Sequence, residues 1–245
     1  MRFPFRLPEE AEFDVIGFGT NAVDHLIRVP IYPPLDSKIE LIEHIETPGG
    51  EVASTLVGLQ RLGFKTLYAG RFGGDSAGEI GIASLAAEGV DISDAEIIAA
   101  ARTQIAFILV DDQSGERTVI WQRDSRLAYS ADEAPVNSAP KAKILHMTAH
   151  DPPACVQMAR AARAHGLIVS LDVDNVFPDV SALLPSIDIC LTSAGFLENF
   201  LGTPDPRTAI SEIASRYGCS VVGCTNGSAG SILWCGNTFI QTKAF

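Results

Sequence analysis

The chain has 245 residues, of which 47% are hydrophobic and 20% are charged, a balance that excludes an intrinsically disordered protein. A formal net charge of −12 repels polyanions and argues against nucleic acid as a partner. No apolar run approaches the ~20 residues that cross a membrane, and residues 1–12 lack the apolar centre of a signal peptide. The five cysteines are odd in number and form no C-x-x-C pair, which predicts reduced thiols in a cytoplasmic protein.

The first half of the chain alternates between patterns typical of strands and of helices. Asp14 to Phe18 is a short apolar run that predicts a buried strand, and residues 51–62 carry apolar side chains at three- and four-residue spacing, which predicts a helix. Two more polar segments flank a proline-rich break at 30–34 and predict antiparallel strands with one exposed face. The predicted elements are strands at 14–18, 24–29 and 38–45, a helix at 51–62, a strand at 66–69, a helix at 77–87, and a hairpin over 104–110 and 117–121.

The second half continues this alternation and ends in a hairpin around Gly236-Asn237. Strands that alternate with helices predict a mainly parallel sheet with helices on both faces. The predicted elements are strands at 144–147, 167–173, 187–191 and 220–224, helices at 155–165 and 208–217, and hairpin strands at 231–234 and 238–241.

The segment from Gly17 to Ala22 matches the dinucleotide-binding pattern G-x-G-x-x-A after a strand. That pattern holds a pyrophosphate only where a helix begins at once, because the helix N-terminus provides the amide donors. Residues 23–34 end in prolines and have no helical apolar face, so the sequence argues against nicotinamide binding.

Gly74 to Gly78 is formally a G-x-S-x-G segment, which in hydrolases places a nucleophilic serine between a strand and a helix. Here two glycines and Asp75 precede Ser76, where a hydrolase needs an apolar strand that runs almost into the turn. A glycine-rich turn into a capped helix is the favoured interpretation, and a serine hydrolase that uses Ser76 is the weaker alternative.

His146 and His150 have the spacing that binds zinc on a helix, but they straddle the end of a predicted strand, which argues against a metal site.

Asp172 and Asp174 lie two residues apart at the carboxyl end of a predicted strand, so their side chains point the same way. Ligands of open α/β sheets bind at that edge. Two interpretations stay open at this point: a ligand contact, or a turn before Pro178.

Two glycine-rich segments give the strongest signal through their order in the chain. Gly49-Gly50 precedes a predicted helix, where glycines allow close approach of a ligand and offer amide donors. The segment from Thr225 to Gly230 follows a predicted strand and could surround a nucleotide in the same way.

With these segments in this order, the chain resembles the ribokinase-like (PfkB) carbohydrate kinase family. The resemblance implies one three-layer, Rossmann-like α/β domain over 1–245, with a mainly parallel central sheet and a small β-sheet lid inserted at about 24–46 and 104–121. The residues that carry it are Gly19 and Asp24, Thr47 to Gly50 with the helix to Gly63, Gly70 to Asp75 with Gly78, Glu88 to Asp91, and Thr225, Gly227 and Gly230.

The resemblance implies ATP-dependent, Mg²⁺-assisted phosphorylation of a hydroxyl group on a sugar or nucleoside. It places a substrate site and a nucleotide site, and it implies a homodimer formed through the lid. A lid that closes excludes water, which protects ATP from hydrolysis. The implied substrate residues are Asp24, Gly49, Gly50 and Ser54, and the implied nucleotide residues are Asp172, Thr225, Gly227 and Gly230.

The chain departs from the family pattern at three places. Ser54 stands where many members have an asparagine for the sugar, so the sugar itself cannot be carried over. Ala194 and Gly195 stand in the segment where the family has a glutamate that organises magnesium. The family's D-T-x-G-A-G-D segment, with its catalytic aspartate, is absent up to Phe245.

We therefore expect that the last part of the fold and the catalytic aspartate lie beyond Phe245, and that the chain as written is inactive. The alternative is a non-catalytic relative that binds or senses a sugar or nucleotide.

Overall fold

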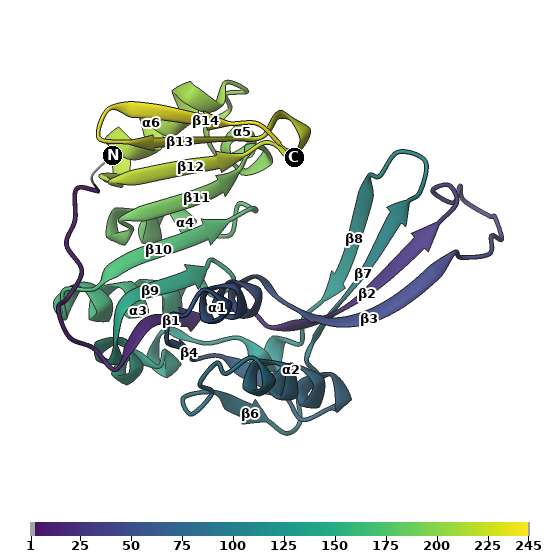
Figure 1. Cartoon of the computed structure of the whole chain (residues 1–245), viewed down its shortest axis with the longest axis horizontal. Helices are drawn as coiled ribbons and strands as arrows, with labels where there is room; N and C mark the ends of the chain where they lie inside the picture. Colours follow the sequence, from purple (N-terminus) through teal and green to yellow (C-terminus); the bar gives the residue numbers. More distant parts are fainter. Residues whose placement is uncertain (1–2, 245) are drawn as a thin grey trace.

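The computed structural model describes residues 3–244 and is built on a large sheet (Figure 1). Within those residues the sheet has eight strands in the order β14-β13-β12-β11-β10-β9-β1-β4. Neighbouring strands from β4 to β12 are parallel, and β13 and β14 add an antiparallel hairpin at the edge. The strands are β1 (Phe13–Phe18), β4 (Thr66–Tyr68), β9 (Ala142–Thr148), β10 (Ile168–Val173), β11 (Ile189–Ser193), β12 (Val221–Thr225), β13 (Ser231–Cys235) and β14 (Thr238–Thr242). The mainly parallel α/β sheet predicted from the sequence is confirmed.

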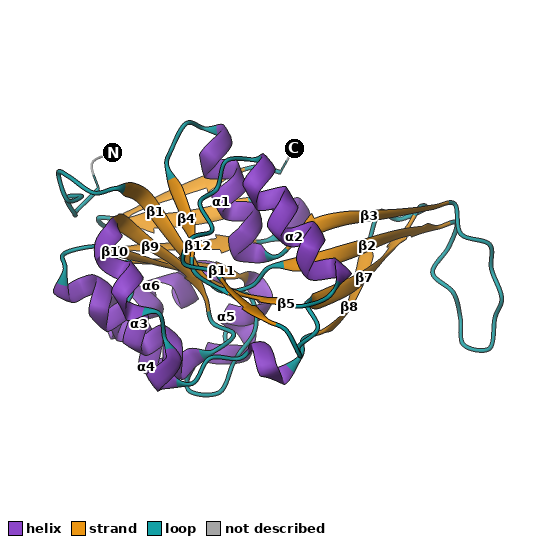
Figure 2. Cartoon of the chain, turned by 90° about the horizontal axis from the view of Figure 1, so that it is seen from below, coloured by secondary structure: helices purple, strands orange, loops and turns teal. Residues whose placement is uncertain are grey.

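Helices cover both faces of this sheet, as Figure 2 shows. β1 illustrates why two layers are needed: Ile16 and Phe18 pack in one apolar cluster with the helices of one face, while Val15 packs in a second cluster on the other face. The first face carries α3 (Pro152–Ala164), α4 (Val180–Leu183), α5 (Ala194–Leu201) and α6 (Pro206–Tyr217), and the second carries α1 (Glu51–Arg61) and α2 (Ser76–Ala87). None of the helices within 3–244 is both long enough and apolar enough to cross a membrane.

A second, smaller sheet projects away from this body (Figure 1). It contains β2 (Ala22–Val29), β3 (Glu43–Gly49), β7 (Gln104–Asp111) and β8 (Arg117–Gln122) in the order β3-β2-β7-β8. β2 is antiparallel to β3 and parallel to β7, and β7 and β8 form the predicted hairpin. Strands from two distant segments of the sequence therefore make one sheet.

The strand predicted at 38–45 is displaced in the structure. It begins at Glu43 and continues through Pro48 to Gly49. The reason is its partner: β2 ends at Val29, and Glu43 already pairs with Arg28, so the alternating residues before position 42 have no strand beside them.

Several short elements were not predicted. β5 (Arg71–Gly73) and β6 (Glu96–Ile98) form a two-stranded sheet beside α2, and α4 and α5 occupy segments with no amphipathic pattern long enough to indicate a helix. α3 begins at Pro152, three residues before its predicted start, because prolines are favoured in the first turn of a helix. The 3₁₀ turns are η1 (Ser125–Leu127), η2 (Ala131–Glu133), η3 (Val136–Lys141), η4 (Leu184–Ser186) and η5 (Gly227–Ala229).

Two glycines provide a matched test of how tightly α1 packs on the sheet. A Cβ added to Gly17 of β1 would lie 2.6 Å from Val52 Cγ1 and 2.7 Å from Leu56 Cδ1, whereas one added to Gly58 on the outer side of α1 meets no atom within 4 Å. We expect Gly17→Ala to lower the free energy of unfolding by about 1–3 kcal/mol, because it overpacks the interface. Gly58→Ala should raise it by about 0.5–1 kcal/mol, because alanine favours the helix. Urea unfolding measures both, and equal stability of Gly17→Ala and the parent chain would contradict this packing.

Candidate active site

A cavity of about 320 Å³ lies where the small sheet meets the carboxyl edge of the large one. The start of α1 contributes Gly50, Glu51 and Ser54 to its lining. β2 contributes Asp24, and the loop after β10 contributes Asp174. Three of the four predicted substrate residues (Asp24, Gly50 and Ser54) therefore line one cavity.

The fourth, Gly49, lies beneath the carboxylate of Asp24. A Cβ added to Gly49 would collide with Asp24 Oδ2, and one added to Gly50 would lie 2.5 Å from Asn21 Cα. Gly50 also has a φ of 97°, in the region that favours glycine. The glycine pair is thus required to let the chain pass under β2 as it enters α1, in addition to forming part of the cavity.

The predicted nucleotide residues lie along the same edge, nearer β12. Asp172 is the last but one residue of β10 and lies beside Leu191, and Thr225 at the end of β12 pairs with Ser193 at the end of β11. Thr225 thus lies two strands across and two residues further along than Asp172, which corresponds to roughly 12 Å. The two groups of predicted residues share one face of the sheet edge.

The glycines that follow β12 differ in their surroundings. A Cβ added to Gly227 meets no atom within 4 Å, so the backbone of η5 is accessible. Gly230 instead packs against Thr242 and Ala244, where any side chain would collide with the backbone. Gly227 is therefore open to a ligand, while Gly230 holds the turn against the end of β14.

Glu51 lines the cavity, and sequence reasoning missed it as a site residue. It is the first residue of α1, and its Oε2 lies 3.4 Å from Thr20 Oγ1 and 3.6 Å from His150 Nδ1. Burial, with the negative charges of Asp174 and Asp172 adding to it, raises the pKa of Glu51 to about 7. An acidic residue in the first turn is common in any helix, so nothing in the local sequence marks this one as facing a cavity.

Two further carboxylates have raised pKa values. Burial raises the pKa of Asp24, and the nearby charge of His25 opposes only part of that shift. Burial, together with the charge of Asp174, raises the pKa of Asp172. Burial is therefore the largest cause of the raised pKa at each of these three carboxylates.

The two histidines weighed as a zinc pair are separated by their environments. His146 is buried in β9 with Nδ1 3.2 Å from Ser170 Oγ, and burial lowers its pKa to about 4. His150 lies beyond the end of β9 and lines the cavity. In the described part of the chain, no three His, Cys, Asp or Glu side chains are grouped so that they could hold a metal ion.

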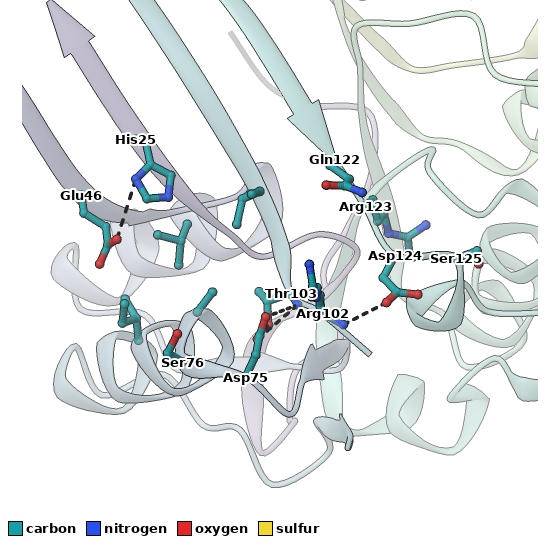
Figure 3. A pocket seen from close by; sticks show the side chains of 14 residues that line it. His25, Glu46, Asp75, Ser76, Arg102, Thr103, Gln122, Arg123, Asp124 and Ser125 are labelled. Carbon is teal, nitrogen blue, oxygen red and sulfur yellow. Dashed lines mark hydrogen bonds and ion pairs between the residues drawn. The ribbon is translucent and has the colours of Figure 1, made fainter. Parts of the chain in front are cut away.

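A larger cavity of about 800 Å³ lies on the opposite face of the small sheet (Figure 3). Figure 3 shows Ser76 of α2 and His25 of β2 on separate walls. Asp75 caps α2 by accepting from the Gly78 amide at 3.0 Å, and it also accepts from Thr103 Oγ1 at 2.8 Å. The G-x-S-x-G segment is therefore the capped helix start that the sequence favoured.

The dinucleotide-binding interpretation of Gly17 to Ala22 does not fit the structure. β1 ends at Phe18 and β2 begins at Ala22, so a strand follows where a helix N-terminus is required.

Comparison with known proteins agrees with the resemblance found in the sequence. Residues 22–245 match the sequence profile of the pfkB family carbohydrate kinases. A nucleoside kinase of Methanothermobacter thermautotrophicus is 25% identical over 235 residues, which cover 90% of this chain and 72% of the relative. An ATP-dependent ribose-1-phosphate kinase of Halopiger xanaduensis is 28% identical over 158 residues, which cover 64% of this chain and 53% of that relative.

Solved structures show the same fold. The ribokinase of Arabidopsis thaliana in complex with ribose and ATP superposes with a TM-score of 0.74 and 21% identity, covering 94% of this chain and 78% of the other. The adenosine kinase of Sinorhizobium meliloti gives a TM-score of 0.79 and 20% identity, covering 96% and 81%. The fold class expected from the sequence is confirmed.

The raised pKa of Glu51 predicts a pH-dependent stability. The folded chain holds this proton more tightly than the unfolded chain, so the associated stability is fully present below about pH 4.5 and is lost as the pH rises through about 7. Glu51→Gln keeps the side chain neutral and should be more stable than the parent at pH 8. Because 36% of the side chain is exposed, we expect a gain of only about 1 kcal/mol.

Urea unfolding at pH 4.5 and pH 8 measures this difference, with Glu40→Gln in the exposed loop before β3 as the control. An equal effect of Glu51→Gln at both pH values would show that Glu51 does not titrate in this range.

Proposed function

The chain belongs to the PfkB family of carbohydrate kinases, and on that basis we propose that its 320 Å³ cavity binds a sugar or nucleoside whose hydroxyl group is phosphorylated by ATP. The position of Asp24 carries this proposal. Its carboxylate lies over Gly49 and faces a cavity at the edge where α/β sheets bind ligands. A carboxylate accepts hydrogen bonds from several hydroxyl groups at once, which suits a polyol. Burial already raises the pKa of Asp24, so hydroxyl donors would replace water that the carboxylate has lost.

The small sheet is suited to act as a lid over this substrate. Ala106 and Ile108 of β7 and Val119 and Trp121 of β8 give the cavity an apolar wall. Such a wall packs on the C–H face of a sugar ring and excludes water when closed, which strengthens the polar contacts beneath it.

We place the ATP phosphates along the edge between Asp172 and Thr225. The accessible backbone at Gly227 supports this placement, because free amides at a glycine turn bind phosphate oxygens. Gly230 then acts by holding the turn rather than by touching the nucleotide.

Asp172 and Asp174 are the residues that fit a magnesium ion. Burial and the charge of Asp174 raise the pKa of Asp172, and a cation between them would relieve that repulsion. Magnesium is usually held by one or two carboxylates together with substrate phosphates, and when bound it neutralises phosphate charge. The role of these two side chains is to position the ion next to the nucleotide.

A non-catalytic sugar- or nucleotide-binding relative is the second candidate, and α5 favours it. Ala194 and Gly195 begin that helix, with Ser193 capping it by accepting from the Phe196 amide at 3.0 Å. Neither side chain offers the carboxylate that the resemblance places in this segment.

Two further properties belong to the proposal. A homodimer would form through the small sheet, whose exposed apolar residues include Ile45, Phe107 and Ile120. A cytoplasmic location fits the use of ATP and the five free, buried cysteines.

Calorimetry and an ADP-release assay on the 245-residue chain test the proposal with a panel of pentoses, hexoses and nucleosides. Because the D-T-x-G-A-G-D segment is not among these residues, we expect sugar and ATP to bind without turnover. Turnover would remove the non-catalytic candidate, and failure of every panel member to bind would overturn the substrate site. A serine hydrolase that uses Ser76 is the weaker alternative, which labelling by a fluorophosphonate would support.

Asp24→Asn tests the residue that carries the proposal. Loss of charge-assisted hydrogen bonds is worth about 1.5–3 kcal/mol, so we expect sugar affinity to fall at least about tenfold while ATP affinity is unchanged. Asp36→Asn is the control, because Asp36 lies in the exposed loop before β3 and has a φ of 58°, which asparagine tolerates. Equal sugar affinity of Asp24→Asn and the parent in calorimetry would remove Asp24 from the site.

A further inference from the structure

We propose that Glu51 selects substrates by their charge. The cavity accepts a neutral polyol, or one that bears a protonated amine, and rejects a sugar phosphate. This inference rests on the proposed function, because it concerns the same cavity. It distinguishes this chain from the ribose-1-phosphate kinase of Halopiger xanaduensis, whose name specifies a phosphorylated sugar.

The lining of the cavity carries one sign of charge. Asp24, Glu51 and Asp174 line it from three different elements, and among the residues that the structure describes there, none is a lysine or arginine. Arg123 is the nearby cation, but its guanidinium donates to both carboxylate oxygens of Asp151, at 2.8 and 2.7 Å, and lines other cavities. Within residues 3–244, no lysine or arginine is therefore placed in this lining to receive a phosphate.

His150 is the one lining side chain in the described chain that could become a cation, and its environment opposes this. Burial, with the charge of Arg123 adding to it, lowers the pKa of His150. Its ring lies against Phe177 with centroids 4.9 Å apart and against the edge of Trp121 at 6.1 Å. At neutral pH it contributes a hydrogen-bonding ring and not a positive charge.

Two unpaired polar atoms indicate that a ligand with hydrogen-bonding groups completes this cavity. His150 Nδ1 and Gln104 Oε1 are fully buried, line the cavity and have no hydrogen-bond partner in the described structure. The His150 side chain as a whole is only 11% exposed. Buried polar atoms without partners are costly, so hydroxyl or amine groups that pair with them are favoured.

We assign the selection by charge to Glu51 because the other polar and charged groups of the cavity surround it. It contacts Thr20 and His150, and the charges of Asp172 and Asp174 from the end of β10 act on it. Asp24 faces the same cavity from β2. A phosphate brought into this space would meet like charges in a partly desolvated site, where repulsion is stronger than in water. A protonated amine in the same space would be attracted by these carboxylates.

The ionisation of Glu51 near neutral pH predicts that the ligand preference of the cavity depends on pH. Its pKa of about 7 means that the charge develops between about pH 6 and pH 8. The preference for uncharged over phosphorylated substrate should grow across that range. Burial also shifts the pKa values of Asp24, Asp172 and His150 around the cavity, so Glu51→Gln is needed to assign the change.

The experiment is calorimetry without ATP and with EDTA, using matched ligands: ribose with ribose 1-phosphate, and glucose with glucosamine, alongside fructose and adenosine. For the parent chain at pH 8 we expect ribose 1-phosphate to bind at least about tenfold more weakly than ribose. At pH 7, where most of its amine is protonated, we expect glucosamine to bind more tightly than glucose. Glu51→Gln should reduce the phosphate penalty at least about threefold at pH 8 and make its growth between pH 6 and pH 8 smaller than in the parent. The growth that remains is expected from the second ionisation of the phosphate itself, near about pH 6.

The matched control is Glu46→Gln, because Glu46 lies on the opposite face of the small sheet and lines the other cavity. It should leave the ratios unchanged. If a neutral sugar or nucleoside binds but its phosphate binds equally well, or if Glu51→Gln leaves the ratio unaltered, the charge inference fails and the proposed function stands. If no neutral ligand binds, the proposed function fails and this inference fails with it.

Discussion

No side chain fits where β3 passes into α1, and the rest of the site depends on that constraint. Gly49 leaves room for the carboxylate of Asp24, and Gly50 lies against the backbone of Asn21 and Ala22 at a positive φ. The crossing holds β2 against the first turn of α1. Glu51 and Ser54 therefore face the same space as Asp24, although β2 and α1 belong to different parts of the structure. A single steric requirement thus places two carboxylates and a helix start around one cavity.

The carboxyl edge of the parallel sheet continues from this cavity toward β12. Because β1, β9, β10, β11 and β12 are parallel, their carboxyl ends meet at one edge, and the segments that leave those ends form a row. The row passes from the cavity to the turn at Gly227. Two ligands bound at its two ends would approach each other along the edge, as the transfer of a group between them requires.

The sequence predicted the elements whose pattern is local. The helix after Gly49-Gly50 and the hairpin of β7 and β8 were recognised because periodicity and turn residues mark them. β3 was displaced because its alternation begins before a partner strand is available, and pairing is a tertiary property. α5 was missed because its eight residues are too few to show a helical period. Glu51 was missed as a site residue because it looks ordinary in sequence, and His150 was considered only as a zinc ligand. Only the fold makes the two side chains neighbours.

The way the small sheet is attached has a mechanical consequence. All four of its strands connect to the body at one end, through the segments before β2 and β7 and those after β3 and β8. One junction is pinned, because Thr103, just before β7, is tied to Asp75 at the start of α2. Another carries the sterically locked glycine pair. The small sheet therefore has no single hinge. Any movement relative to the large sheet must change the backbone of all four connecting segments together, so we expect a small rigid-body tilt and not a large rotation.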